Sequence, residues 1–204
     1  KYTDIRIHAL IRPRFGDFCY TEHEIEIMKS QIRALKEAGV EVDPDENGTT
    51  FAENAMIKAR AVYDLCKLPT VADDSGLCVD ALNGEPGIYS ARYTGKHEDT
   101  DKDRNLYLLK KMEGVEHRTA RFVSCISCTF PNGDRIDTRG ECEGEIMYAV
   151  SGKNGFGYDP IFYYPPAGMS TAEMPSEEKN KVSHRGNALR EFYEKLKEAG
   201  YADK

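Results

Sequence analysis

Residues 72–76 read Ala-Asp-Asp-Ser-Gly, after the apolar stretch Leu-Pro-Thr-Val at residues 68–71 and before Leu-Cys-Val at residues 77–79. We interpret this stretch as the end of a buried strand, predicted over residues 69–73, where adjacent carboxylates are costly unless paired. Successive strand side chains point to opposite faces, so Asp73 and Asp74 face different sides. One is expected to face a cleft, and the other to anchor a turn through local hydrogen bonds. A turn without any chemistry remains the alternative.

The bulk composition narrows the class of protein. A chain of 204 residues fits one domain and buries a substantial core. The net charge of −7 argues against general nucleic-acid binding, but a local basic cluster would still bind a small polyanionic substrate. There is no run of 18 apolar residues and no signal-like apolar core near the start, so we expect a cytoplasmic protein without a membrane span.

The cysteines are predicted to be structural thiols. Six cysteines in a chain of this length show no disulfide framework. Cys125 and Cys128 form a C-x-x-C pair, but it lies inside a predicted strand at residues 121–130. Residues three apart on a strand face opposite sides, so we expect these two thiols to be separated by the sheet.

Local patterns predict strands mixed with helices. Thr50 and Glu53 have the spacing of a capping box, which predicts a helix over residues 51–67. The turn sequence Pro-Asn-Gly-Asp follows the predicted strand at 121–130, so we expect a hairpin that returns through residues 135–140. Two further helices are predicted, at residues 100–113 and 184–198. This mixture indicates an α/β or α+β domain.

Acidic residues bracket the predicted helix at residues 51–67; they are Asp45, Glu46, Glu53, Asp73 and Asp74. Carboxylates of this kind suit Mg²⁺, which prefers one or two of them together with water and substrate phosphate. Glu53 has an alternative role as the capping-box acid, and Asp45 and Glu46 fit equally well as solvated loop charges.

A glycine-rich stretch, Gly155-Phe156-Gly157-Tyr158-Asp159, is the second candidate for a binding site. Its glycines would let the backbone approach a ligand, and its two aromatic rings would stack on a flat base. It is not a Walker loop, because no Gly-Lys-Ser/Thr follows. A turn packed with aromatic side chains is the alternative.

A basic cluster at residues 178–185 is the third candidate. Ser183 is the predicted N-cap of the last helix, so His184 and Arg185 would lie where the helix dipole favours an anion. The alternative is a solvated charged segment. Together, an acidic metal site, an aromatic loop and a basic anion site predict hydrolysis of a nucleotide phosphate.

Five sequence blocks occur in order: Thr-Phe-Ala-Glu-Asn-Ala at 50–55 with Lys-Ala-Arg at 58–60, Ala-Asp-Asp-Ser-Gly-Leu at 72–77, Gly-Glu-Pro-Gly-Ile-Tyr-Ser-Ala-Arg-Tyr at 84–93, residues 155–162, and Glu-Lys at 178–179 with Ser-His-Arg at 183–185. This ordered set resembles the inosine triphosphate pyrophosphatase family, also described as dITP/XTP diphosphatases, over about residues 35–198. The resemblance implies an elongated α/β fold with a long central mixed sheet flanked by helices, and a homodimer. It also implies Mg²⁺-dependent cleavage of ITP, dITP or XTP to the monophosphate and pyrophosphate, which removes non-standard purines from the nucleotide pool.

The resemblance also assigns roles to individual residues. Asp74 resembles the general base or metal carboxylate, and Glu46 its partner in holding the metal. The expected substrate contacts are Ser75, the base-binding loop of Phe156, Gly157, Tyr158 and Asp159, and the base and phosphate contacts Lys179, His184 and Arg185.

Residues 1–34 depart from the family pattern. The family opens with a strand ending in (Ser/Thr)-x-Asn-x-x-Lys, and nothing in residues 1–34 matches it. Reading the codons of residues 17–24 one base later permits Ile-Phe-Ala-Thr-Xaa-Asn-(Met/Thr)-Lys, which predicts a frame-shifted segment ahead of a pyrophosphatase domain at residues 35–204. Two alternatives remain: a catalytically impaired nucleotide-binding homologue, and another Mg²⁺-dependent phosphohydrolase that uses the same carboxylates.

Overall fold

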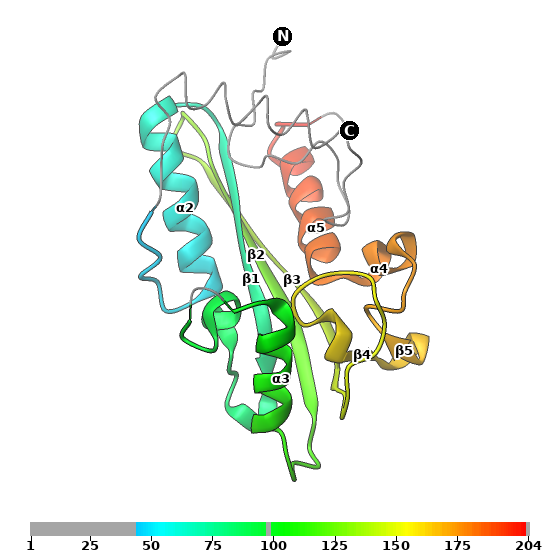
Figure 1. The fold of residues 1–204 in the computed structure, drawn as a ribbon. Helices are drawn as coiled ribbons and strands as arrows, with labels where there is room; N and C mark the ends of the chain where they lie inside the picture. Colours follow the sequence, from blue (N-terminus) through cyan, green and yellow to red (C-terminus); the bar gives the residue numbers. More distant parts are fainter. Residues whose placement is uncertain (1–43, 97–98, 203–204) are drawn as a thin grey trace.

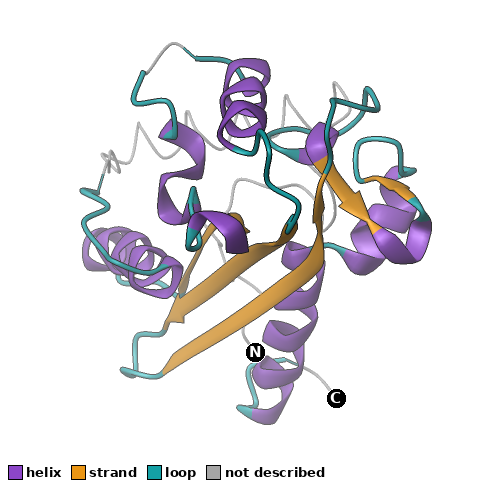
Figure 2. Ribbon diagram, turned by 90° about the horizontal axis from the view of Figure 1, so that it is seen from below, coloured by secondary structure: helices purple, strands orange, loops and turns teal. Residues whose placement is uncertain are grey.

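The structure, a computed structural model, describes residues 44–96 and 99–202. Five strands form one antiparallel sheet in the order β1-β2-β3-β4-β5, and helices cover both of its faces (Figures 1 and 2). The strands are β1 (Thr70–Val79), β2 (Thr119–Thr129), β3 (Arg135–Ile146), β4 (Phe162–Tyr164) and β5 (Met169–Ser170). The helices are α2 (Phe51–Cys66), α3 (Asp101–Lys111), α4 (Ser176–Val182) and α5 (His184–Glu198), with short 3-10 helices η1 (Asp80–Leu82), η2 (Gly87–Arg92), η3 (Asp159–Ile161) and η4 (Pro165–Ala167).

This architecture confirms the predicted α/β class, with helices flanking a central sheet. Every pairing among the described strands is antiparallel, so the mixed character implied by the resemblance is not found within residues 44–96 and 99–202. The prediction for residues 1–34 lies outside the described residues. Within the described part of the chain, no helix combines the length and apolar character needed to cross a membrane.

Strand β1 is longer than the sequence predicted. It continues through Asp73, Asp74 and Gly76 and pairs with β2 along its whole length, from Thr70 opposite Thr129 to Val79 opposite Ala120. The turn alternative for residues 72–76 is therefore wrong, as is the local turn anchor expected of one aspartate. Ten residues of continuous pairing with a buried neighbour outweigh the poor strand propensity of Asp and Gly.

The sheet separates two layers of side chains, as the strand alternation predicted. Cys125 packs with Phe51 and Ala55 on the α2 side, whereas Cys128 packs with Phe192 on the α5 side. The two thiols of the C-x-x-C pair therefore lie on opposite faces, and both are buried. Burial raises the pKa of Cys128 to about 12, so this thiol stays protonated and unreactive near neutral pH.

Local sequence fixes the start of each long helix. Thr50 accepts a hydrogen bond from the Glu53 backbone N–H, and the Glu53 carboxylate accepts one from Thr50, so the predicted capping box opens α2. Glu53 is thus a capping residue, as its alternative role predicted. Ser183 accepts a bond from the Gly186 N–H and caps α5, also as predicted.

A glycine lets α5 approach the sheet closely. A Cβ on Gly140 of β3 would lie 2.2 Å from both the Ala188 nitrogen and the His184 oxygen. No real side chain tolerates such a contact, so α5 rests directly on the β3 backbone at this point. The first turn of α5, with His184 and Arg185, is thereby held beside β1 and β2.

Candidate active site

The predicted site residues fall into two groups that meet on β1. Asp74 belongs to an acidic cluster on the α2 side, and Ser75 lines a cavity on the α5 side. Adjacent Cα atoms are about 3.8 Å apart, so the two groups adjoin at one point of the strand. The register supports this separation, because Asp74 lies opposite Cys125 of the α2 layer and Asp73 opposite Ile126 of the α5 layer.

The acidic cluster is built around Lys58. Its ammonium Nζ lies 2.7 Å from Asp74 Oδ1 and 3.1 Å from Glu46 Oε1. Asn54, one turn before Lys58 on α2, donates a 3.3 Å hydrogen bond from Nδ2 to Asp74 Oδ2. The structure therefore brings together the two predicted metal ligands, and it adds two α2 residues to which the sequence had assigned no role.

Burial sets the electrostatics of this cluster. Removal from water raises the pKa of Asp74, while hydrogen bonds from Lys58 and Asn54 and the charge of Lys58 oppose that rise. The negative charge of Glu46 raises the pKa of Asp74 further. The pKa of Lys58 is also raised: burial alone would lower it, but its contacts with Asp74 and Glu46 outweigh that effect. Asp74 is thus a half-buried carboxylate whose affinity for protons is increased, as a general base requires.

The cluster has the composition that Mg²⁺ prefers. The Glu46 and Asp74 carboxylates both contact the Lys58 ammonium group, so they lie close to each other. Mg²⁺ is commonly held by one or two carboxylates, and water and phosphate complete its coordination shell. Within residues 44–96 and 99–202, no group of three or more acidic, His or Cys side chains is placed to hold a metal. Among the described acidic, His and Cys side chains, Glu46 and Asp74 are therefore the pair that a metal here would use.

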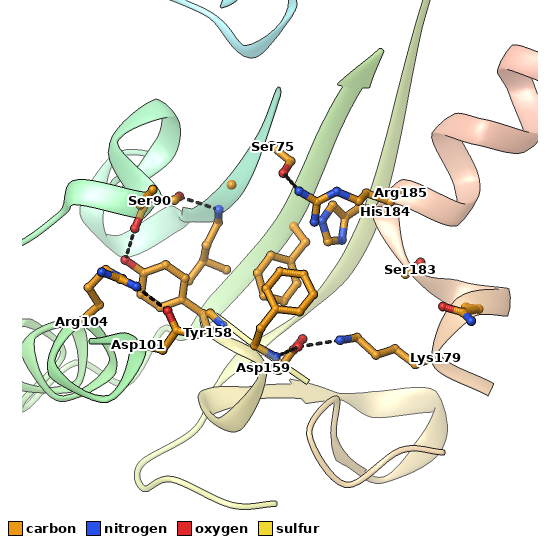
Figure 3. Close-up of a pocket in the computed structure, with 17 residues that line it drawn as sticks. Ser75, Ser90, Asp101, Arg104, Tyr158, Asp159, Lys179, Ser183, His184 and Arg185 are labelled. Carbon is orange, nitrogen blue, oxygen red and sulfur yellow. Dashed lines mark hydrogen bonds and ion pairs between the residues drawn. The ribbon is translucent and has the colours of Figure 1, made fainter. Parts of the chain in front are cut away.

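The second group surrounds a cavity of about 220 Å³ (Figure 3). β1 contributes Ser75, the glycine-rich stretch contributes residues 156–159, and the α4–α5 segment contributes Lys179, His184 and Arg185. All eight predicted substrate-binding residues line this one cavity. Three segments far apart in sequence are thus brought together as the resemblance implied.

The buried Asp159 carboxylate holds the glycine-rich stretch in place by accepting hydrogen bonds from three residues. It is 4% exposed, and its Oδ2 accepts bonds from the Phe156 N–H at 2.8 Å and from Lys179 Nζ at 2.5 Å. Its Oδ1 accepts a 2.9 Å bond from the Thr171 hydroxyl. Both carboxylate oxygens therefore have protein partners, and Asp159 supports the cavity wall from within the protein.

Tyr158 and Gly157 are anchored to neighbouring elements. The buried Tyr158 hydroxyl donates to the Ser90 carbonyl at 2.8 Å, and burial raises the pKa of Tyr158. Gly157 donates its N–H to Asp101 Oδ2 at 2.6 Å and accepts a 3.0 Å bond from Asn105 Nδ2. The first two turns of α3 thus bind both the N–H and the carbonyl of Gly157. No local sequence pattern predicted these contacts.

Phe156 is the aromatic residue of this stretch that remains accessible. Its side chain is 40% exposed, whereas that of Tyr158 is 4% exposed. Lys179 Nζ lies 5.1 Å from the centre of the Phe156 ring, and Arg185 Cζ lies 5.7 Å from it. The ring thus offers a stacking surface bordered by two cationic side chains.

His184 and Arg185 lie at the start of α5 with different surroundings. The His184 ring stacks on Phe122 at 4.9 Å, and burial holds its pKa well below the usual range, so it is neutral at pH 7. Arg185 donates from Nε to Asp73 Oδ2 at 2.9 Å and from Nη2 to the Ser75 hydroxyl at 2.6 Å. Asp73 therefore contacts α5 on the cavity side of the sheet, and Ser75 pairs with the same arginine, which lines the cavity.

Comparisons with known proteins identify the family of this chain. The family model described as the Ham1 family matches residues 20–195. A dITP/XTP pyrophosphatase of Treponema denticola is 50% identical over 168 residues, covering 80% of this chain and 86% of that protein. A protein of the same name from Thermus thermophilus is 51% identical over 157 residues, covering 76% of this chain and 75% of the relative.

Solved structures give the same relationship. The Ham1 protein of Staphylococcus aureus superposes with a TM-score of 0.78 at 38% identity, covering 89% of this chain and 96% of that one. A nucleoside-triphosphatase, dITP/XTP pyrophosphatase, of Mycobacterium abscessus gives a TM-score of 0.69 at 37% identity, covering 85% and 95%. The motifs, the fold and these matches together place the chain in the Ham1 family.

Proposed function

We propose that this protein hydrolyses non-standard purine nucleoside triphosphates, namely ITP, dITP and XTP, to the monophosphate and pyrophosphate. The names of the relatives support the substrate class, because several of them are dITP/XTP pyrophosphatases. The observation that carries the proposal is the adjacency on β1 of Asp74, in the acidic cluster, and Ser75, in the cavity. One nucleotide can therefore place its base in the cavity and its phosphates beside the carboxylates.

The cavity suits a purine that carries a keto group at position 6. Phe156 would stack on the base, while Lys179 and Arg185 offer hydrogen-bond donors and no acceptors. A keto oxygen accepts such bonds, whereas the amino group of adenine would present another donor. Burying unmatched donors costs binding energy, so Lys179 and Arg185 favour hypoxanthine and xanthine over adenine.

The acidic cluster supplies the proton chemistry. Asp74 would take a proton from a water molecule whose oxygen attacks the α-phosphorus. The bond from that phosphorus to the bridging oxygen breaks, and pyrophosphate leaves with the electron pair. Lys58, within 3.1 Å of both carboxylates, would orient Asp74 and offset negative charge. When bound by Glu46 and Asp74, Mg²⁺ would supply positive charge that neutralises the phosphates.

We further propose a cytoplasmic homodimer, which follows from the family resemblance and from a substrate drawn from the nucleotide pool. The mass of the purified protein, measured by light scattering, tests the dimer. A monomer over the micromolar range would contradict it.

A second candidate is a nucleotide-binding homologue with little turnover. It is favoured by residues 1–34, which lack the phosphate-holding motif expected at the family's opening strand. Sequencing the gene tests the frame-shift hypothesis for this segment. The frame-shift hypothesis would be wrong if the reading frame were unbroken and no frame upstream of residue 35 encoded the family's opening motif.

Pyrophosphate release separates the two candidates. The full chain is incubated with ITP, dITP, XTP or ATP in the presence of Mg²⁺ or of excess chelator. We expect release from the first three nucleotides with Mg²⁺ and none with chelator. Tight ITP binding without release would favour the second candidate.

A further inference from the structure

We propose that Asp73 is a positioning residue that fixes the Arg185 guanidinium for recognition of the purine 6-keto group, and thereby sets base selectivity. This inference rests on the proposed function and deepens it. It gives the first carboxylate of the Asp-Asp pair a role separate from that of Asp74.

The contact geometry carries the inference. Asp73 and Ser75 lie two residues apart on β1 and therefore point to the same face of the sheet. Asp73 Oδ2 accepts from Arg185 Nε at 2.9 Å, and the Ser75 hydroxyl accepts from Nη2 at 2.6 Å. Two acceptors on one rigid strand thus hold one edge of a planar guanidinium, which fixes its orientation as well as its position.

Arg185 needs such support because of its place in the chain. It is the second residue of α5, and its long side chain reaches from the helix across to β1 (Figure 3). A free arginine side chain loses rotamer entropy when it is ordered. Because Asp73 already orders the Arg185 side chain in the free protein, this entropy loss does not weaken nucleotide binding.

The location of the contact links it to the base. The Arg185 Cζ lies 5.7 Å from the centre of the accessible Phe156 ring, and both residues line the same cavity. A base stacked on Phe156 would therefore meet a guanidinium whose orientation is set by β1. The Arg185 guanidinium only donates hydrogen bonds. In its fixed orientation it can therefore bond to a keto oxygen but not to an amino group, which is also a donor.

The test compares nucleotide selectivity in Asp73→Asn and in the unaltered chain, with Mg²⁺ present. We expect kcat/KM for ITP to fall about ten-fold, mainly through KM, while that for ATP is unchanged. The ITP-to-ATP ratio then falls by the same factor. Asp73→Glu should recover part of it, since the carboxylate is restored. In an Arg185→Met background, Asp73→Asn should have no further effect on the ratio.

Asp80→Asn is a matched control. Asp80 pairs with Arg121 at 2.9 Å, and the two side chains are 32% and 31% exposed, comparable to the 26% of Asp73. Neither residue lines the cavity. This variant should leave the ITP-to-ATP ratio unchanged.

Other outcomes would overturn the inference. If Asp73→Asn lowers kcat/KM for ITP and ATP equally, or leaves both unchanged, Asp73 does not set selectivity. Dissociation constants for ITP and ATP, measured by calorimetry, make the test independent of turnover. If the unaltered chain binds ITP without hydrolysing it, the proposed function fails, and the shift in the ratio of dissociation constants still decides the role of Asp73. If it binds neither nucleotide, both proposals fail.

Discussion

Asp73 and Asp74 are consecutive on β1, yet their carboxylates contact opposite layers of the protein. Asp74 Oδ1 lies 2.7 Å from Lys58 Nζ on α2, and Asp73 Oδ2 lies 2.9 Å from Arg185 Nε on α5. The alternation of a regular strand therefore gives one acid to the proposed hydrolytic cluster and the other to Arg185, which lines the cavity. A small shift of this strand would disturb both.

Lys58→Met should change the pH dependence of the reaction. Lys58 opposes the rise in the pKa of Asp74 that burial causes, so its removal raises that pKa further. The general base must be ionised, and kcat/KM therefore falls as the pH drops through the pKa of Asp74. We expect this acid limb to lie at higher pH in Lys58→Met than in the unaltered chain, as measured by pH–rate profiles for ITP. The exposed Lys67→Met serves as the control, and an unmoved limb in Lys58→Met would argue against the role of Lys58.

Asp159→Ala should destabilise the fold. This change leaves Lys179, whose side chain is 13% exposed, without its carboxylate partner and removes acceptors from Phe156 and Thr171. Breaking a buried ion pair costs about 3 to 5 kcal/mol in the free energy of unfolding. Urea denaturation measures this loss. Glu191→Ala, which breaks an exposed pair with Lys195, should cost less than about 1 kcal/mol. Equal losses of unfolding free energy in the two variants would show that the Asp159 contacts do not stabilise the fold more than an exposed ion pair does.

Asn105→Ala should weaken substrate binding without changing the chemical step. Asn105 holds the Gly157 carbonyl from α3, and Gly157 lines the cavity proposed to bind the base, next to Phe156. Loss of one such bond should raise the KM for ITP by about two- to ten-fold, with kcat preserved. Steady-state kinetics provide the measurement, and Lys102→Ala on the exposed side of α3 is the control. A fall in kcat at constant KM would contradict this assignment.

His184 should make stability depend on pH in a known direction. Burial holds its pKa in the folded chain well below the ordinary value, whereas the unfolded chain takes up a proton near pH 6.5. The unfolded state then binds more protons, so stability is lost as the pH falls below about 6.5. The slope from this one group approaches about 1.4 kcal/mol per pH unit.

The slope is isolated by a variant. Denaturation between pH 5 and pH 7 should show a flatter dependence in His184→Gln than in the unaltered chain. His117→Gln, which changes an exposed histidine, is the matched control for the substitution itself. If the slopes for the unaltered chain and His184→Gln coincide, His184 takes up a proton in the folded state.

Local sequence signals predicted the parts of the fold that depend on neighbouring residues. The Thr50–Glu53 capping box, the Ser183 N-cap and the turn after β2 all lie where the sequence placed them. The extent of β1 was underestimated, because pairing with β2 decides it and the propensities of Asp and Gly do not.

The long-range contacts of the site had no such signal. Asp73 and Arg185 are 112 residues apart, and Gly157 lies 52 residues from Asn105, so only the folded chain reveals these pairs. The contact of Lys58 with the acidic cluster, in contrast, could have been predicted. Lys58 lies one turn after Asn54 on a predicted helix that acidic residues bracket, and this spacing places both side chains on one face of the helix. The roles of the predicted site residues in substrate binding and catalysis stay predictions.

In the proposed mechanism, Asp74 activates the water molecule that releases pyrophosphate. The most direct test measures Mg²⁺-dependent pyrophosphate release from ITP by the unaltered chain and by Asp74→Asn, with thermal unfolding of both. Burial disfavours the ionised Asp74, so the isosteric neutral Asn should leave the unfolding temperature nearly unchanged. We expect robust release by the unaltered chain and a loss of at least about 100-fold in kcat for Asp74→Asn. Near-normal release by a folded Asp74→Asn variant would contradict it.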